Sequence, residues 1–158
     1  MQLLMMRHGE AGFEQSVDEQ RRLTDLGQRE VLHMGSKLAP WFTECQLVLV
    51  SPYVRAQQTL TCLTSYLPES AQVVTLPELT PESNPDLSHD VIAAHCELTQ
   101  AKRVLVIAHM PLLAYLVREF VPGQEPPLFA TAAVASIELS DAGHKLTGMH
   151  APAFTEVL

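Results

Sequence analysis

The chain opens with Gln2-Leu3-Leu4-Met5-Met6-Arg7-His8-Gly9-Glu10, an apolar run that passes directly into charged and polar residues. Short continuous apolar runs are typical of strands buried on both faces of a sheet. Two later runs have the same character: Leu47–Val50, followed by Ser51-Pro52, and Arg103–Ala108, followed by His109. Each run predicts a buried strand with chemically active residues at its carboxyl end.

Segments with helical periodicity separate these strands. An apolar stripe predicts a helix from Asp25 to about Phe42, with Thr24 as its N-cap. Ser51 is predicted to cap the next helix, because a proline follows it at the first helical position. The other predicted elements are a strand over Val73–Leu76, a helix marked by Leu87, Val91, Ala94 and Leu98, a helix over Leu112–Phe120, and strands over Ala133–Leu139 and Leu146–His150; loops are predicted over Glu14–Arg22, Leu79–Pro85 and Val121–Leu128.

This alternation of strands and helices predicts an α/β fold, a three-layer sandwich around a mostly parallel sheet. No repeat, low-complexity tract or linker divides the sequence, so residues 1–158 are predicted to form a single domain. In open parallel sheets, ligands bind beyond the carboxyl ends of the strands. The residues that follow the buried strands are therefore the candidates for function.

Composition narrows the possible functions. The 158 residues carry 10 Lys+Arg and 18 Asp+Glu, a net charge of −8, which argues against nonspecific nucleic-acid binding. No apolar run reaches the length of a membrane span, and no signal peptide is evident, so the cytoplasm is the expected location. The three cysteines form no CxxC pair and the histidines share no metal-ligand spacing, so no zinc site is expected.

The strand ends carry residues suited to phosphoryl chemistry. Arg7 and His8 end the first strand, Ser51 leads to Arg55, and His109 ends a later strand. Arginine offers planar, permanently charged donors for phosphoryl oxygens, and neutral imidazole is a good nucleophile for phosphorus. The first turn of the helix after Ser51 also offers free N–H groups at this edge, so Ser51 is included among the predicted phosphoryl-binding residues.

The loop before the first helix offers two more cations, Arg21 and Arg22. They stand beside Asp18 and Glu19, so an ordinary mixed-charge surface loop explains them about as well as a phosphate site does. Taken singly, a histidine at a strand end or an arginine on a helix is more often structural than catalytic.

Together, however, the segments resemble the signature motifs of the histidine phosphatase superfamily. Met6–Glu10 resembles its RHG motif, Leu23–Gly27 its L-T-x-x-G helix start, and Ser51–Thr59 its S-P-x-x-R-A-x-Q-T segment. Val106–His109 resembles the strand that delivers the second histidine of the family. The motifs come in family order between residues 7 and 109. The short chain and the stretch Leu76–Pro81 are most similar to the SixA-type phosphohistidine phosphatases.

This resemblance implies a phosphoglycerate-mutase-like fold and assigns roles to the residues. It makes His8 the residue that becomes transiently phosphorylated, with Arg7 and Arg55 holding the phosphoryl oxygens. It makes His109 the group that completes the pocket and stabilises the transferred group, and Arg21 a further phosphate-facing arginine. It implies that the reaction uses no metal and no cofactor.

One feature departs from the larger family members, which carry an acidic residue after the third strand to protonate the leaving oxygen. The corresponding region here is Glu78–Asp90, and it lacks the usual glycine-rich acidic context. Asp18 and Glu82 are the candidate acids, although each is also explained as a loop carboxylate. An alkoxide leaving group benefits from such an acid by about 10²–10⁴ in rate, whereas imidazole, with a pKa of about 6.5, leaves readily.

These observations predict a phosphohistidine phosphatase that acts on a histidine-containing phosphotransfer domain of a signalling relay. Phosphate or another oxyanion would occupy its pocket, and neither a nucleic acid nor a membrane would be a partner. A small-molecule phosphomonoesterase of the same fold is the alternative, and it would need one of the loop carboxylates as an acid. A noncatalytic phospho-binding module is a third hypothesis, disfavoured because both histidines and both arginines are present.

Overall fold

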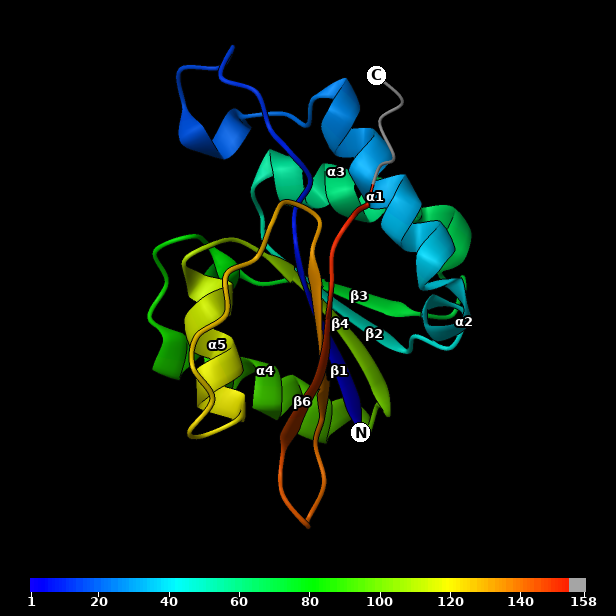
Figure 1. The fold of residues 1–158 in the computed structure, drawn as a ribbon, viewed down its shortest axis with the longest axis vertical. Coiled ribbons are helices and arrows are strands. Elements are labelled where there is room, and N and C mark those ends of the chain that lie inside the picture. The colour runs from blue at the N-terminus through cyan, green and yellow to red at the C-terminus, as the bar shows by residue number, and fades with distance from the viewer. Residues whose placement is uncertain (154–158) are drawn as a thin grey trace.

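A six-stranded sheet in the order β3-β2-β4-β1-β5-β6 forms the middle layer of the computed structural model, which describes residues 1–153 (Figure 1). β1 pairs in parallel with β4, as β4 does with β2 and β2 with β3, whereas β5 runs antiparallel to both β1 and β6. The predicted mostly parallel sheet is therefore present, with an antiparallel edge. The strands are β1 (Gln2–Arg7), β2 (Leu47–Val50), β3 (Gln72–Thr75), β4 (Arg103–Ala108), β5 (Val134–Glu138) and β6 (Lys145–His150).

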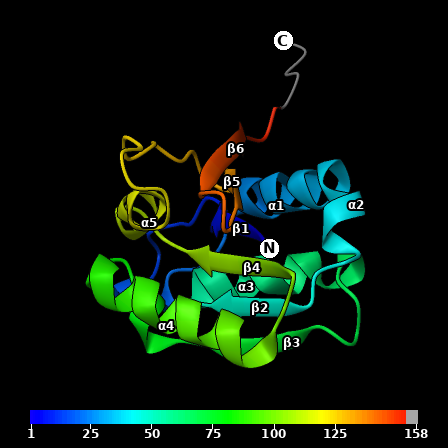
Figure 2. The same cartoon turned by 90° about the horizontal axis from the view of Figure 1, so that it is seen from below.

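Helices cover both faces of the sheet, which gives the predicted three layers (Figure 2). One face packs on α4 and α5 and the other on α1 and α3, because alternate residues of β1 point to opposite sides: Leu3 and Met5 join one core cluster, Leu4 and Met6 the other. Within residues 1–153, none of the helices combines the length and apolar character needed to cross a bilayer. The helices are α1 (Asp25–Lys37), α2 (Ala39–Phe42), α3 (Val54–Leu63), α4 (Pro85–Thr99) and α5 (Leu112–Phe120), with short 3-10 turns η1 (Asp18–Gln20), η2 (Thr64–Tyr66) and η3 (Pro77–Leu79).

The first predicted helix is present but divided. Thr24 caps it as expected, since its hydroxyl accepts a hydrogen bond from the Gly27 N–H at 3.0 Å. The expected continuous helix to Phe42 is wrong, because α1 ends at Lys37 and a separate turn, α2, follows. Pro40 has no N–H to continue the helical ladder, which explains the break.

One other detail of the prediction is wrong. Ser51 does not cap α3: the helix begins at Val54, and the Ser51 hydroxyl instead accepts from the Tyr53 N–H at 3.2 Å.

The predicted helix marked by Leu87, Val91, Ala94 and Leu98 is present as α4. Its buried side chains are Ser88, Ile92 and Cys96, whereas Leu87 and Leu98 are exposed. Both stripes have helical spacing, so periodicity located the helix without deciding which face is buried.

Two glycines of the sequence motifs permit a close approach between the loop after β1 and the start of α1. A Cβ atom on Gly27 would collide with the carbonyl oxygen of Glu10, and one on Gly9 would lie 2.5 Å from the Gly27 oxygen. The Thr24 N–H donates to the same Glu10 oxygen at 2.9 Å, which holds the two segments together. The glycines therefore fix the path of the chain just after His8.

We expect Gly27→Ala to lower the free energy of unfolding by about 1–3 kcal/mol, because the methyl group has to displace backbone. Gly35→Ala, in the same helix, is the matched control. Its methyl group would meet the side chains of Tyr66 and Leu63 rather than backbone, and side chains shift more easily than backbone. Urea denaturation of both variants measures the difference, and a Gly27→Ala protein as stable as Gly35→Ala would contradict this account.

Candidate active site

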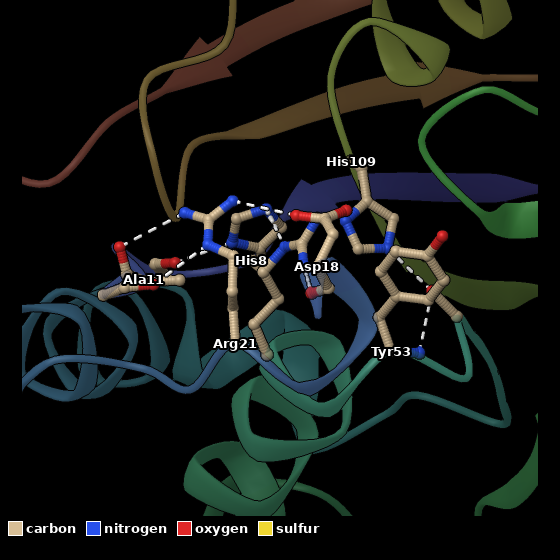
Figure 3. A network of polar contacts seen from close by, with 10 residues as sticks. His8, Ala11, Asp18, Arg21, Tyr53 and His109 are labelled. Carbon is tan, nitrogen blue, oxygen red and sulfur yellow. Dashed lines mark hydrogen bonds and ion pairs between the residues drawn. The ribbon is translucent and has the colours of Figure 1, made fainter. Parts of the chain in front are cut away.

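The predicted residues meet at the carboxyl ends of three neighbouring strands. Register pairs Arg7 of β1 with Ala108 of β4, so His8 and His109 emerge side by side, with their ring centroids 5.0 Å apart. Ser51 follows β2, and α3 supplies Arg55. Figure 3 shows the His8, Asp18 and His109 side chains directed into one space. The convergence expected from the sequence is therefore present in the structure.

His8 is held in one tautomer. Its Nδ1 lies 2.6 Å from the Gly9 carbonyl oxygen, which can only accept, so Nδ1 carries the proton. Its Nε2 lies 3.3 Å from Nε of Arg55, which can only donate. The Nε2 lone pair is thus unprotonated and directed toward the arginine-lined side of the site, as a nucleophile requires.

The surroundings of His8 also keep its ring neutral. Burial lowers the pKa of His8 from 6.5 to about 4, helped by the charges of Arg55 and Arg7 and opposed only by the hydrogen bond to the Gly9 carbonyl. The residue is only 6% exposed, so desolvation is the larger cause. At neutral pH the imidazole is therefore ready to attack phosphorus.

Ser51 orients the second histidine. The Ser51 hydroxyl accepts from the Tyr53 N–H and lies 2.7 Å from Nε2 of His109, so its own proton is available for that nitrogen. In this arrangement Nδ1 of His109 carries the ring proton, and it is buried with no partner within residues 1–153. Burial, together with the neighbouring His8, lowers the pKa of His109 well below its ordinary value. His109 can therefore offer a neutral N–H donor to a phosphoryl oxygen.

The arginines differ in how they are engaged. Arg7 donates from Nη1 to the Phe129 carbonyl at 2.7 Å, while its buried Nε has no partner among the described residues. All three nitrogens of Arg55 are occupied: Nε by His8, Nη1 by the Asp18 carbonyl at 2.6 Å, and Nη2 by the Asp18 carboxylate at 3.2 Å. Arg21 donates to the same carboxylate at 3.1 Å.

The candidate general acids gain no support from this geometry. Burial alone would raise the pKa of Asp18, but hydrogen bonds and charges from Arg21 and Arg55 outweigh it and lower that pKa. An acid catalyst needs the opposite shift. Glu82 is exposed, and its charge adds to the factors, led by burial, that raise the pKa of Tyr53. Within residues 1–153, Asp18 is the one carboxylate that contacts a histidine or arginine of the site.

Some supporting residues escaped the sequence analysis. The Thr59 hydroxyl accepts from the Gly9 N–H at 3.2 Å and donates to the Arg55 carbonyl at 2.8 Å, which joins β1 to α3. The Tyr53 ring packs against His109, with centroids 5.0 Å apart, and lies beneath the Arg55 guanidinium. Both residues stand inside the motif that surrounds Arg55, so their positions in the sequence were the available signal.

The described part of the chain, residues 1–153, contains no group of three or more His, Cys, Asp or Glu side chains placed to hold a metal ion. Cys45, Cys62 and Cys96 are free thiols. Burial raises the pKa of Cys45 and of Cys96 to about 11, so neither is a ready nucleophile. The positive charge of the site comes from its arginines.

The sequence profile of the histidine phosphatase superfamily (branch 1) matches residues 3–82. The chain belongs to this superfamily. It is 43% identical over 148 residues to the phosphohistidine phosphatase SixA of Escherichia coli K12, a match that covers 91% of this chain and 89% of the relative. It is 29% identical to a SixA homologue of Haemophilus influenzae, over 87% of each chain.

Solved structures agree with this membership. A structure of the protein histidine phosphatase SixA complexed with tungstate aligns with a TM-score of 0.88 and 37% identity, over 96% of this chain and 97% of that one. A putative α-ribazole-5′-P phosphatase of Escherichia coli aligns at 0.73 with 18% identity, over 97% and 98% of the two chains, which shows a shared fold alone. The predictions of a histidine phosphatase, most similar to SixA, and of a phosphoglycerate-mutase-like fold are confirmed.

We expect His8 to remain neutral at pH 6, where an ordinary histidine with a pKa of about 6.5 is mostly protonated. Because its pKa is lowered to about 4, protonation should begin only as the pH falls toward that value. Nitrogen-15 NMR of ring-labelled protein in oxyanion-free buffer measures this, with His8→Gln to assign the signal. A titration midpoint close to 6.5 would contradict the burial argument.

Proposed function

We propose that this protein is a metal-independent phosphohistidine phosphatase that dephosphorylates a histidine-containing phosphotransfer domain of a cytoplasmic signalling relay. The observation that carries the proposal is the unprotonated Nε2 of His8, buried beside Arg55, in a site where Arg7 Nε and His109 Nδ1 have no partner among the described residues. We further propose that residues 1–158 act as one catalytic domain, since the site draws on segments from Arg7 to His109.

The reaction follows from the positions of these groups. The lone pair of His8 Nε2 attacks phosphorus while the bond between phosphorus and the substrate imidazole breaks. That imidazole, protonated on its other ring nitrogen, leaves with the bonding pair as a neutral ring. Arg7, Arg55 and the Nδ1–H of His109 stabilise the equatorial oxygens during transfer. Water then attacks phospho-His8, which releases inorganic phosphate and restores the neutral ring. Ser51 acts here as a positioning residue for His109, and Arg21 as an outer phosphate-facing arginine.

The carboxylates of the site favour phosphohistidine over phosphate esters. An ester releases an alkoxide, which needs a proton from an acid of raised pKa. Asp18 has a lowered pKa and is paired with two arginines. An imidazole leaves without such an acid, so this site is matched to a P–N bond.

Exposed apolar side chains beside the site suit a macromolecular substrate. Phe13 is 82% exposed and packs over Arg21, and Leu128 is 88% exposed next to Phe129, whose carbonyl holds Arg7. The loops that carry them, residues 9–24 and 121–132, both approach the carboxyl end of β1 (Figure 1). A protein surface around the phosphohistidine could cover these side chains, whereas a small phosphate ester would leave them in water.

We expect brief mixing with a phosphorylated phosphotransfer domain, followed by denaturation without acid, to trap a phosphoryl group on His8. The P–N bond should be stable to alkali and labile to acid, and mass spectrometry should locate it. His8→Ala should abolish the label and lower turnover by about a thousandfold or more, since the nucleophile is lost, with an unchanged circular dichroism spectrum. A label on Ser51 or on a cysteine would overturn the mechanism.

We expect Leu128→Ser to lower kcat/KM on the phosphorylated protein by about 5- to 30-fold, the usual range for an interface side chain worth 1–2 kcal/mol. Turnover of p-nitrophenyl phosphate, which is too small to reach Leu128 from the site, should change less than twofold. Leu98→Ser is the matched control, because Leu98 is 81% exposed on α4, near the opposite end of the sheet. Equal losses on both substrates, or an equal loss in the control, would remove the argument for a protein substrate.

A further inference from the structure

Asp18 holds the site arginines in the way that a phosphoryl group would. One carboxylate oxygen accepts from Arg21 at 3.1 Å, and the other accepts from Arg55 at 3.2 Å. Two oxygens of one anion thus bridge two guanidinium groups, which is the pattern expected for a bound phosphate. The donors that the carboxylate does not reach, Arg7 Nε and His109 Nδ1, are the buried ones left without partners in the described chain.

The two sides of this contact differ in how firmly they are held. Arg55 is 4% exposed and sits on α3, where Thr59 binds its carbonyl oxygen. The side chain of Asp18 is 54% exposed, and residues 13–20 around it are all exposed. The turn η1 buries no residue and has no side-chain cap. Moving the Asp18 carboxylate away would therefore break few packing contacts and would leave the hydrogen bond from Arg55 Nη1 to the Asp18 carbonyl in place. Moving Arg55 would disturb the core of the site.

We propose that the Asp18 carboxylate is a built-in competitor for the phosphoryl site, which a bound phosphoryl group displaces from Arg55 and Arg21, and that it thereby limits how far free phosphate occupies the site. That the natural occupant is a phosphoryl group rests on the proposed function; the competition for oxyanions rests on the contacts alone.

The competition weakens the binding of every oxyanion by the same factor, because each oxyanion must first displace the Asp18 carboxylate from the arginines. Free phosphate has no contacts outside the phosphoryl pocket with which to offset that cost. A phosphorylated protein does have them, since Phe13 and Val17 stand exposed on the same loop as Asp18. Release of the product phosphate is favoured for the same reason, because Asp18 can return to the arginines. Asp18 thus limits the occupancy of the site by free phosphate, in contrast to the acid catalyst considered from the sequence.

Asp18→Asn tests the competition directly. The amide keeps the size of the side chain but removes the charge that pairs with Arg21 and Arg55. Isothermal titration with tungstate and with inorganic phosphate at pH 7 should show binding tightened by about 5- to 50-fold, a coupling of ordinary size. Asp18→Ala should also tighten oxyanion binding. This second variant is needed because the amide of Asp18→Asn could keep a hydrogen bond to one of the arginines. Glu19→Gln is the charge-matched control: it lies on the same turn, makes none of these contacts, and should change binding less than twofold.

The opposite result identifies a different role. If Asp18 only positions Arg55, both Asp18 variants would bind tungstate more weakly than the wild type or equally well, and the proposal would be overturned. If Glu19→Gln tightened oxyanion binding as much as the Asp18 variants, the effect would be one of overall charge, and the proposal would again be overturned. Because oxyanion binding is measured without turnover, failure to hydrolyse phosphohistidine would overturn the proposed function while leaving the competition intact. The competition during turnover is measured as the inhibition constant of phosphate, which should fall in Asp18→Asn by the factor found in the titration.

Discussion

The buried positive charge of Arg55 sets the requirements that the rest of the site meets. A guanidinium taken out of water needs partners for its donors and a compensating charge. The structure supplies the His8 ring, the Asp18 carbonyl and the Asp18 carboxylate. The same charge helps to keep His8 neutral, so one interaction both prepares the nucleophile and creates the place for an anion.

Short contacts between segments that are distant in the sequence hold His8 and Arg55 in place. The central position of β1, between β4 and β5, brings His8 beside His109. Gly9 and Gly27 let the loop after β1 lie directly against α1, and Thr59 joins that loop to the helix of Arg55. Glu30 adds a further tie, since its carboxylate accepts from the Glu10 N–H and from the Thr131 hydroxyl. The His8 ring is thus placed by contacts of the backbone beside it, and its Nε2 is turned toward Arg55.

The choice of substrate lies in the loops rather than in the sheet. The same fold occurs in proteins named for quite different phosphate esters, so the sheet and its helices do not select the leaving group. In this site the Asp18 carboxylate pairs with two arginines, and the exposed side chains of Phe13 and Leu128 stand on neighbouring loops. Asp18, Phe13 and Leu128 all lie outside the long helices and the strands, where sequence changes disturb the core packing least.

The sequence by itself determined the elements whose local pattern was unambiguous. The continuous apolar runs predicted β2 and β4 with their observed bounds, α5 was predicted with its observed bounds, and the spaced motifs indicated the family. The same motifs named His8, Arg55 and His109 as candidates, and the structure brings these residues together. Only the tertiary structure decided which face of α4 is buried, that Ser51 holds His109, and that Asp18 pairs with Arg55. The physical reason is separation along the chain, because the last two contacts join residues 58 and 37 positions apart. Local periodicity does not specify which distant side chain accepts a given hydrogen bond.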